Sequence, residues 1–192
     1  MRTRLSTEQR REQLLTIGAG LFANRPYDEV WIEEVAEIAE VSRGLLYHYF
    51  PTKRDFFAEI VRAERDRLLR LSAPDKSVSH VDQLTIGLDV YLDYAQHHPD
   101  GYRVIHRAAA AGDAEIREIR DAGQAANRER ILAGLADLAT VDATTKLAVR
   151  GWFTFVTAIT LDWLDNPAVT REDLRDLCVR TLFAAVGITP PD

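Results

Sequence analysis

One short segment of the sequence gathers side chains that can bind a polyanion. Residues 41–57 read VSRGLLYHYFPTKRDFF and hold hydroxyls, a guanidinium, an imidazole and a lysine amine in close succession. In a helix, at about 100° per residue, the polar side chains and a glycine share one face: Ser42, Arg43, Gly44, Tyr47 and His48. The opposite face, which we expect to pack on the core, holds Leu46, Tyr49 and Phe50.

These residue types match the chemistry of recognition in the DNA major groove. Arg43 can bond to guanine, and serine and tyrosine hydroxyls can donate to phosphate oxygens. Gly44 has no side chain, so the backbone can approach a partner closely there. Lys53, at the start of the next helix, adds a charge directed at phosphate beside free backbone N–H groups. The alternative is a solvated helix face whose tyrosines are half packed on neighbours.

The surrounding sequence predicts the helices that position this segment. Apolar residues recur at helical spacing over residues 7–24, and a short helix is predicted over 31–39. A tight turn at 40–42 leads to a third helix ending at Phe50, and Thr52 can cap a fourth helix over 53–71. Two short helices separated by about four residues have the outline of a helix-turn-helix.

The rest of the chain is also predicted to be helical. No alternating β-branched run between Asn-Gly or Asp-Gly turns supports a strand. Residues 72–79, with Pro74, are the best linker candidate. The later helices are predicted over 80–97, 99–110, 113–137, 142–165 and 170–186. We therefore expect an all-α fold with a helix-turn-helix domain over 1–50 and a larger helical domain over 51–192.

Composition limits the class of protein. The formal charge is -6, yet residues 1–54 hold eight basic and eight acidic side chains, so the acidity belongs to the remainder. A neutral head is compatible with local contact to a polyanion. No apolar run reaches the roughly 18 residues of a membrane span, and the N-terminus lacks the features of a secretory signal. The single cysteine, Cys178, fits a reducing cytoplasm.

Two charge patterns flank the polar face. The second helix is acidic through Glu33, Glu34, Glu37 and Glu40, which we interpret as a solvated face that repels DNA and narrows the binding surface. The N-terminus is basic through Arg2, Arg4, Arg10 and Arg11. These arginines form either an arm that follows the duplex or a frayed terminus.

Residues 10–57 resemble the N-terminal DNA-binding domain of the TetR (tetracycline-repressor) family of bacterial transcriptional regulators. The most specific match is Val41-Ser42-Arg43-Gly44-x-Leu46-Tyr47-His48-Tyr49-Phe50-Pro51-x-Lys53, supported by Val35-Ala36-x-x-Ala39 and by Leu14-Leu15-x-Ile17-Gly18-Ala19-x-Leu21-Phe22. The resemblance implies an all-helical homodimer that binds a palindromic DNA operator, usually represses, and is released by a small ligand in the C-terminal domain. It also implies that Ser42, Arg43, Gly44, Tyr47, His48 and Tyr49 face DNA and that Lys53 faces a phosphate.

The chain departs from the family pattern at several positions. Glu40 replaces the usual glycine before Val41, so the turn must tolerate its backbone angles in another way or adopt a different shape. Pro26 replaces a common loop glycine, and Trp31 stands where a threonine or serine often contacts phosphate. Leu45, often small and polar in relatives, can instead meet a thymine methyl group.

The two last long helices are apolar over most of their circumference, which favours a homodimer. Residues 147–164 and 174–186 carry these wide apolar surfaces. Two such helices from each of two chains would form an intermolecular four-helix bundle, as the resemblance also implies. The alternative is a monomer with a thick core.

The larger domain is rich in aromatic residues that can line a ligand cavity. The candidates are Tyr91, Tyr94, Tyr102, His106, Trp152 and Phe155. Apolar walls with a few hydrogen-bonding groups favour an apolar or aromatic effector, although the same rings can fill an ordinary core. The histidines at 97, 98 and 106 lack metal-ligand spacing, so we expect no metal and no cofactor.

The sequence thus favours a ligand-responsive, DNA-binding repressor that acts in the cytoplasm and does not enter membranes. One alternative is a regulator that acts constitutively without a small ligand. An enzyme or a helical interaction module belongs to a different class. We do not expect an enzyme, because no set of convergent titratable groups can be assembled from the sequence.

Overall fold

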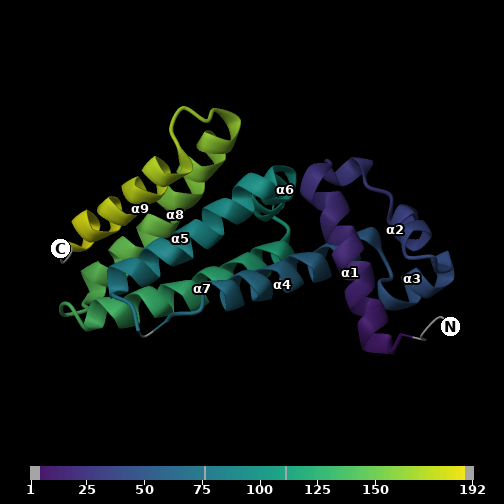
Figure 1. The fold of residues 1–192 in the computed structure, drawn as a ribbon, viewed down its shortest axis with the longest axis horizontal. Coiled ribbons are helices and arrows are strands. Elements are labelled where there is room, and N and C mark those ends of the chain that lie inside the picture. Colours follow the sequence, from purple (N-terminus) through teal and green to yellow (C-terminus); the bar gives the residue numbers. More distant parts are fainter. Residues whose placement is uncertain (1–4, 76, 111, 189–192) are drawn as a thin grey trace. The chain divides into compact units, whose positions relative to one another are not determined.

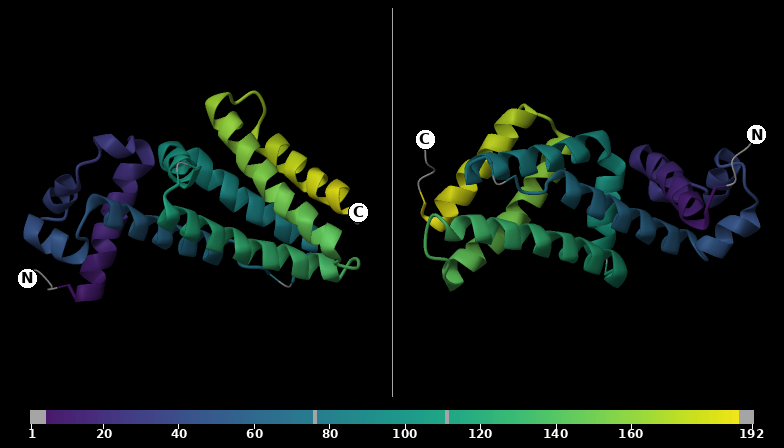
Figure 2. Two further views of the ribbon diagram at one scale, coloured as in Figure 1. Left: turned by 180° about the vertical axis from the view of Figure 1, so that it is seen from behind. Right: turned by 60° about the horizontal axis from the view of Figure 1, so that its bottom comes forward.

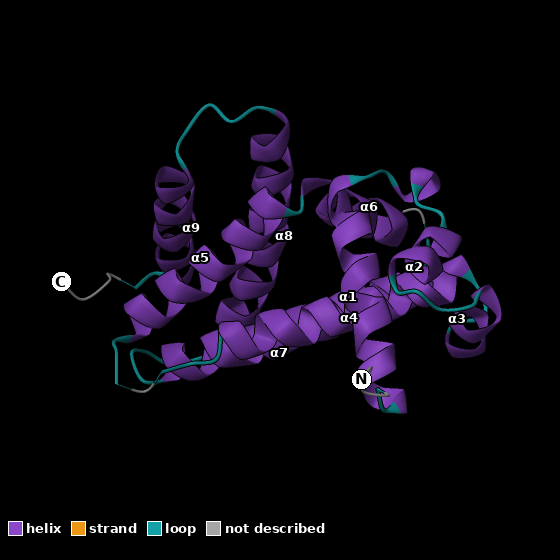
Figure 3. Cartoon of the chain, turned by 45° about the vertical axis from the view of Figure 1, so that its right-hand side comes forward, coloured by secondary structure: helices purple, strands orange, loops and turns teal. Residues whose placement is uncertain are grey.

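The computed structural model describes residues 5–75, 77–110 and 112–188, which form helices and loops without a strand (Figures 1 and 3). The elements are α1 (Thr7–Asn24), the 3₁₀ turn η1 (Tyr27–Glu29), α2 (Ile32–Ile38), α3 (Arg43–Tyr49), α4 (Lys53–Leu71), α5 (His80–His97), α6 (Pro99–Ala110), α7 (Ala114–Ala136), α8 (Ala143–Asp165) and α9 (Arg171–Val186). The all-α prediction is confirmed. The 3₁₀ turn lies in the segment where helical periodicity stops.

Helix starts follow from small polar residues that accept the first free backbone N–H groups. Such side-chain caps precede several helices, among them Ser6 for α1, Ser42 for α3, Asp142 for α8 and Thr170 for α9. The predicted cap of α4 is also present, because the Asp55 N–H donates to Thr52 Oγ1 over 3.0 Å. The predicted linker lies between α4 and α5, where the described residues are not helical.

The chain divides into two compact units. The first comprises described residues within 1–66 and 98–120, and the second comprises those within 67–97 and 121–192. The N-terminal part of α4, helix α6 and the start of α7 thus group with α1 to α3. This grouping does not follow the boundary at residue 50 that the sequence predicted for two functional domains, and that boundary stays a prediction.

A buried apolar cluster holds the helices of the first unit together. Figure 2 shows these helices as ribbons in two further views. Its central members come from α1, α2, α3 and α4: Leu14, Phe22, Val35, Leu46, Phe50 and Phe56. Helix α6 packs closely on α1, because a Cβ atom on Gly101 would lie only 3.2 Å from the Phe22 carbonyl oxygen. The cluster fixes the third helix in place by its inner face.

The second unit is built on α5, α8 and α9, which pack on one another. Val149, Trp152, Cys178 and Leu182 are buried together in its core. The Trp152 indole N–H donates to the Cys178 carbonyl oxygen over 2.8 Å, so this buried polar group is satisfied. None of the described helices is long and apolar enough to span a lipid bilayer.

Candidate nucleic-acid interface

The turn between α2 and α3 keeps the shape that glycine usually permits. The Val41 N–H donates to the Ala36 carbonyl over 2.9 Å, and the Glu40 N–H donates to the Glu37 carbonyl over 3.1 Å. These two bonds form a Schellman closure, whose penultimate residue must be left-handed. Glu40 is that residue, with φ of 52°. A glutamate therefore adopts the backbone conformation that the missing glycine would have taken.

Helix α3 is held by one face and exposed on the other. Leu46 and Phe50 are fully buried, as the helical spacing predicted. The Ser42 side chain accepts the Leu45 N–H over 3.2 Å and begins the helix. The residues on the outer face are exposed: Ser42, Arg43, Gly44, Leu45, Tyr47 and His48. Apart from the adjacent residues and the backbone of α3 itself, no described atom lies within 4 Å of the place where a Cβ on Gly44 would stand, so the backbone is open to a partner there.

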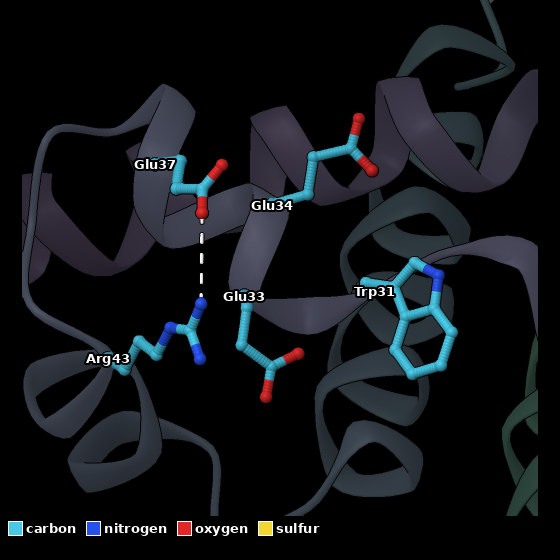
Figure 4. A pocket seen from close by; sticks show the side chains of 5 residues that line it. All are labelled: Trp31, Glu33, Glu34, Glu37 and Arg43. Carbon is cyan, nitrogen blue, oxygen red and sulfur yellow. Dashed lines mark ion pairs between the residues drawn. The ribbon is translucent and has the colours of Figure 1, made fainter.

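Two carboxylates of α2 contact the outer face of α3. The Tyr47 hydroxyl donates to Glu33 Oε1 over 2.7 Å, and Arg43 Nη2 lies 3.8 Å from Glu37 Oε1. Figure 4 shows Arg43 reaching from α3 toward Glu37, with Glu33 between them and Trp31. The sequence did not reveal these contacts, since 14 residues separate Tyr47 from Glu33. The acidic helix is therefore more than the solvated face that we expected.

The hydrogen bond between Tyr47 and Glu33 shifts the pKa values of both groups in opposite directions. The bond from the Tyr47 hydroxyl, more than any other cause, lowers the pKa of the Glu33 carboxyl. The same hydrogen bond to Glu33 is the main cause that raises the pKa of the Tyr47 phenol. At neutral pH the pair is therefore a carboxylate that accepts and a neutral phenol that donates.

The remaining side chains of α2 near this face differ in their partners. Glu34 accepts Arg25 Nη1 over 2.8 Å, so its charge is engaged within the first unit without contacting α3. The Trp31 side chain is 67% exposed and makes no capping bond to α2. An indole can donate only its single N–H, so Trp31 departs from the family pattern by offering a phosphate no hydroxyl.

Three predicted contacts with DNA have partners within the chain. The Lys53 ammonium lies 4.4 Å from the centre of the Tyr27 ring, and partial burial lowers the pKa of Lys53. The Tyr49 hydroxyl donates to the Thr7 carbonyl oxygen over 3.4 Å, and Tyr49 is half-buried. The His48 ring meets that of Tyr49 edge-on, with the ring centres 5.8 Å apart. Of these three, only His48 stays on the exposed face.

The predicted basic arm is only partly described. Arg2 and Arg4 lie outside the described residues. Arg10 and Arg11 belong to helix α1, where Arg10 Nη1 donates to Gln13 Oε1 over 2.6 Å and Arg11 pairs with Glu59. These two arginines are therefore held on a folded helix rather than in an extended arm.

The candidate ligand residues fall into both compact units. Tyr91, Tyr94, Trp152 and Phe155 belong to the second unit, whereas Tyr102 and His106 belong to the first. Trp152 is buried in the core of the second unit, and Tyr91 and Phe155 pack against that core. Their packing is that of ordinary core residues, and the predicted cavity stays a prediction.

His106 is a neutral side chain at physiological pH. Its ring centre lies 4.4 Å from that of Tyr102. Burial, with a smaller contribution from the positive charge of Arg120, lowers the pKa of His106 to about 4. Across the part of the chain that is described, no group of three or more His, Cys, Asp or Glu residues is arranged to hold a metal ion.

Comparison with known proteins identifies both parts of the chain. Residues 14–60 match the family model of bacterial regulatory proteins, tetR family, and residues 81–185 match that of the tetracyclin repressor-like C-terminal domain. A crystal structure of a tetR-family transcriptional regulator from Streptomyces coelicolor superimposes with a TM-score of 0.86 at 29% identity. That alignment covers 94% of this chain and 82% of the other.

Curated relatives match over shorter stretches. The HTH-type transcriptional activator FasR of Mycolicibacterium smegmatis is 28% identical over 104 residues, which cover 53% of this chain and 48% of FasR. The HTH-type transcriptional regulator LuxR of Vibrio harveyi is 40% identical over 60 residues, covering 31% of this chain and 29% of LuxR. The chain thus spans about half the length of the first relative and less than a third of the second.

Proposed function

We infer the function of the chain from its family, since it belongs to the TetR family of bacterial regulatory proteins. We propose a transcriptional regulator that binds a palindromic DNA operator with helix α3. The observation that carries the proposal is the two-faced third helix. Leu46 and Phe50 anchor one face in the core, and Arg43, Gly44 and Tyr47 stand exposed on the other. This is the arrangement by which a recognition helix enters the major groove.

The proposed reader is a homodimer formed through α8 and α9. Both helices bury one face within the second unit, yet large apolar side chains remain exposed, among them Leu147 of α8 at 65% and Leu177 of α9 at 37%. Apolar groups left at such positions favour a second apolar surface. A two-fold dimer reads two half-sites, so a palindromic operator follows from the dimer.

The proposed direction of regulation is repression, relieved by a small apolar or aromatic effector. A dimer seated on an operator can block transcription by occupancy alone. The aromatic side chains of the larger domain support an apolar or aromatic ligand over a charged one, because such pockets combine apolar walls with few polar groups. Acting on chromosomal DNA, the protein would work in the cytoplasm.

Membership of a family of regulators favours this function over an enzyme or an interaction module. A regulator without an effector is the remaining alternative, and it shares the DNA-binding step. The effector and the sign of regulation are tested separately from that step. A reporter gene behind the selected operator would show repression as lower expression, and a metabolite panel would identify release.

The DNA-binding step is tested by selecting duplexes from a random library with the purified protein. We expect an inverted repeat to be enriched. Arg43→Ala should weaken binding to it by about 1–3 kcal/mol, because an arginine at a base edge contributes that much, with an unchanged circular dichroism spectrum. Glu129→Ala, an exposed position on α7 in the second unit, is the control. If no sequence is enriched, or if Arg43→Ala binds as wild type does, the proposal fails.

A further inference from the structure

The hydroxyl hydrogen of Tyr47 is already donated within the protein. Tyr47 stands on the outer face of α3 with its side chain 38% exposed, and its hydroxyl lies 2.7 Å from Glu33 Oε1. That distance is typical of a hydrogen bond from a hydroxyl, and a bond to an ionised acceptor is stronger than one to a neutral group. A phenol has a single hydrogen to donate but two lone pairs. The group that Tyr47 can still offer to DNA is therefore an acceptor.

An acceptor selects among the chemical groups of DNA. Phosphate oxygens are acceptors and need a donor, so they are not partners for a tyrosine whose hydrogen is engaged. The major groove presents two donors, the N6 amino group of adenine and the N4 amino group of cytosine. The negative charge of Glu33, in direct contact with the phenol, also disfavours a phosphate at that place.

We propose that Glu33 is a specificity-determining residue, which turns Tyr47 from a phosphate contact into a reader of the amino group of adenine or cytosine. The inference rests on the DNA-binding function proposed above. Tyr47 touches the base, and Glu33 acts through Tyr47 by fixing the direction of its hydroxyl. This differs from the sequence-based expectation, in which tyrosine hydroxyls donate to phosphates.

The neighbouring contact behaves differently and supports the distinction. Arg43 Nη2 lies 3.8 Å from Glu37 Oε1, and both side chains are largely exposed. Such an exposed, long ion pair is weak. Arg43 can therefore leave Glu37 for guanine or phosphate, and its five N–H groups let it bind DNA while it keeps part of the contact. Tyr47 has no second hydrogen with which to do the same.

The first test measures coupling between Tyr47 and a single base. An operator is selected with the wild-type protein, and each adenine or cytosine of one half-site is replaced by an analogue that lacks the exocyclic amino group. At one position this change should weaken wild-type binding about three- to tenfold, the effect of one lost hydrogen bond. For Tyr47→Phe the same change should have less than about a twofold effect, because the acceptor is already absent.

The second test changes the direction of the hydroxyl. Glu33→Ala leaves Tyr47 free to donate, so the preference at the same position should shift toward guanine or thymine, which present acceptors in the major groove. Glu34→Ala is the matched control, since it removes the same charge from the same helix but breaks a pair with Arg25 instead. The control should keep the wild-type base preference. Circular dichroism and thermal unfolding verify the fold of each variant.

The outcomes separate this inference from the function on which it rests. If Tyr47→Phe couples to a neutral methylphosphonate rather than to an amino group, Tyr47 contacts phosphate and the inference is wrong while DNA binding stands. An unchanged base preference in Glu33→Ala refutes the role of Glu33 in the same way. If the wild-type protein enriches no duplex, the DNA-binding function fails and the inference falls with it.

Discussion

Replacing Glu40 by glycine is expected to stabilise the protein, because this residue holds a left-handed backbone conformation in the turn before α3. Its φ is 52°, and the two bonds that close the turn depend on that conformation. A side chain with a Cβ atom is crowded by the carbonyl oxygen at this angle, whereas glycine is not. The substitution therefore removes strain without altering the hydrogen bonds of the turn.

The expected gain can be worked from two opposing effects. The left-handed conformation costs a residue with a Cβ atom about 1–2 kcal/mol. Replacing a residue by glycine costs about 0.4–1 kcal/mol of stability, because the unfolded chain then has more conformational freedom to lose on folding. At the middle of these two ranges the net stabilisation of Glu40→Gly is about 0.8 kcal/mol, which raises the Tm of a chain of this size by roughly 2–3 °C.

A matched alanine variant separates strain from charge. Glu40→Ala removes the same carboxylate from the C-terminal end of α2, where a negative charge is unfavourable, but it keeps the Cβ atom. Urea unfolding followed by circular dichroism should place glycine above alanine by about 0.5–1 kcal/mol. If Glu40→Gly is no more stable than Glu40→Ala, the turn carries no strain at this residue and the reasoning is refuted.

Further predictions concern packing, assembly and reactivity. Gly18→Ala should destabilise the protein by about 1–3 kcal/mol, since its Cβ would lie 2.6 Å from Cε1 of the buried Phe56 ring and 2.7 Å from Cδ1 of Ile60. Gly20→Ala, which meets no such neighbour within 4 Å, should stabilise the protein by about 0.5–1 kcal/mol. Effects of the same sign in thermal unfolding, or of reversed sign, would contradict this. Leu177→Glu, at an exposed position, should shift sedimentation from that of a dimer to that of a folded monomer. Leu182→Glu, at a buried position, should unfold the chain and reduce its helical circular dichroism signal. Sedimentation of the wild-type protein as a monomer at micromolar concentration would refute the dimer. Burial raises the pKa of the Cys178 thiol to about 11, so iodoacetamide at pH 8 should modify the native protein far more slowly than the urea-unfolded chain.

Helix boundaries could be predicted from the sequence because they depend on local chemistry. Thr7–Asn24, Lys53–Leu71 and His80–His97 begin and end where the periodicity, capping residues and proline placed them. The inward and outward faces of α3 also follow from spacing alone, since Leu46 and Phe50 are buried as expected. The specific string around Ser42 further identified the helix-turn-helix.

Contacts between distant residues could not be predicted in this way. The bond between Tyr47 and Glu33 joins two helices whose crossing is set by the turn at Glu40, and no local pattern encodes that crossing. The grouping of α6 with α1 likewise depends on a close approach at Gly101. The aromatic residues showed the same limit, because helical spacing does not distinguish a core ring such as Trp152 from one that lines a cavity.

The acidic second helix has a consequence for how the proposed DNA reader discriminates. Binding that ignores sequence depends on neutralising phosphates with cations, and residues 1–54 carry as many acidic as basic side chains. Glu33 and Glu37 stand beside the reading helix, where they oppose a close approach of the phosphate backbone. We therefore expect residues 1–54, which carry no net charge, to have little affinity for arbitrary DNA. For the proposed operator we expect the affinity to come mainly from contacts that the exposed side chains of α3 make to base edges.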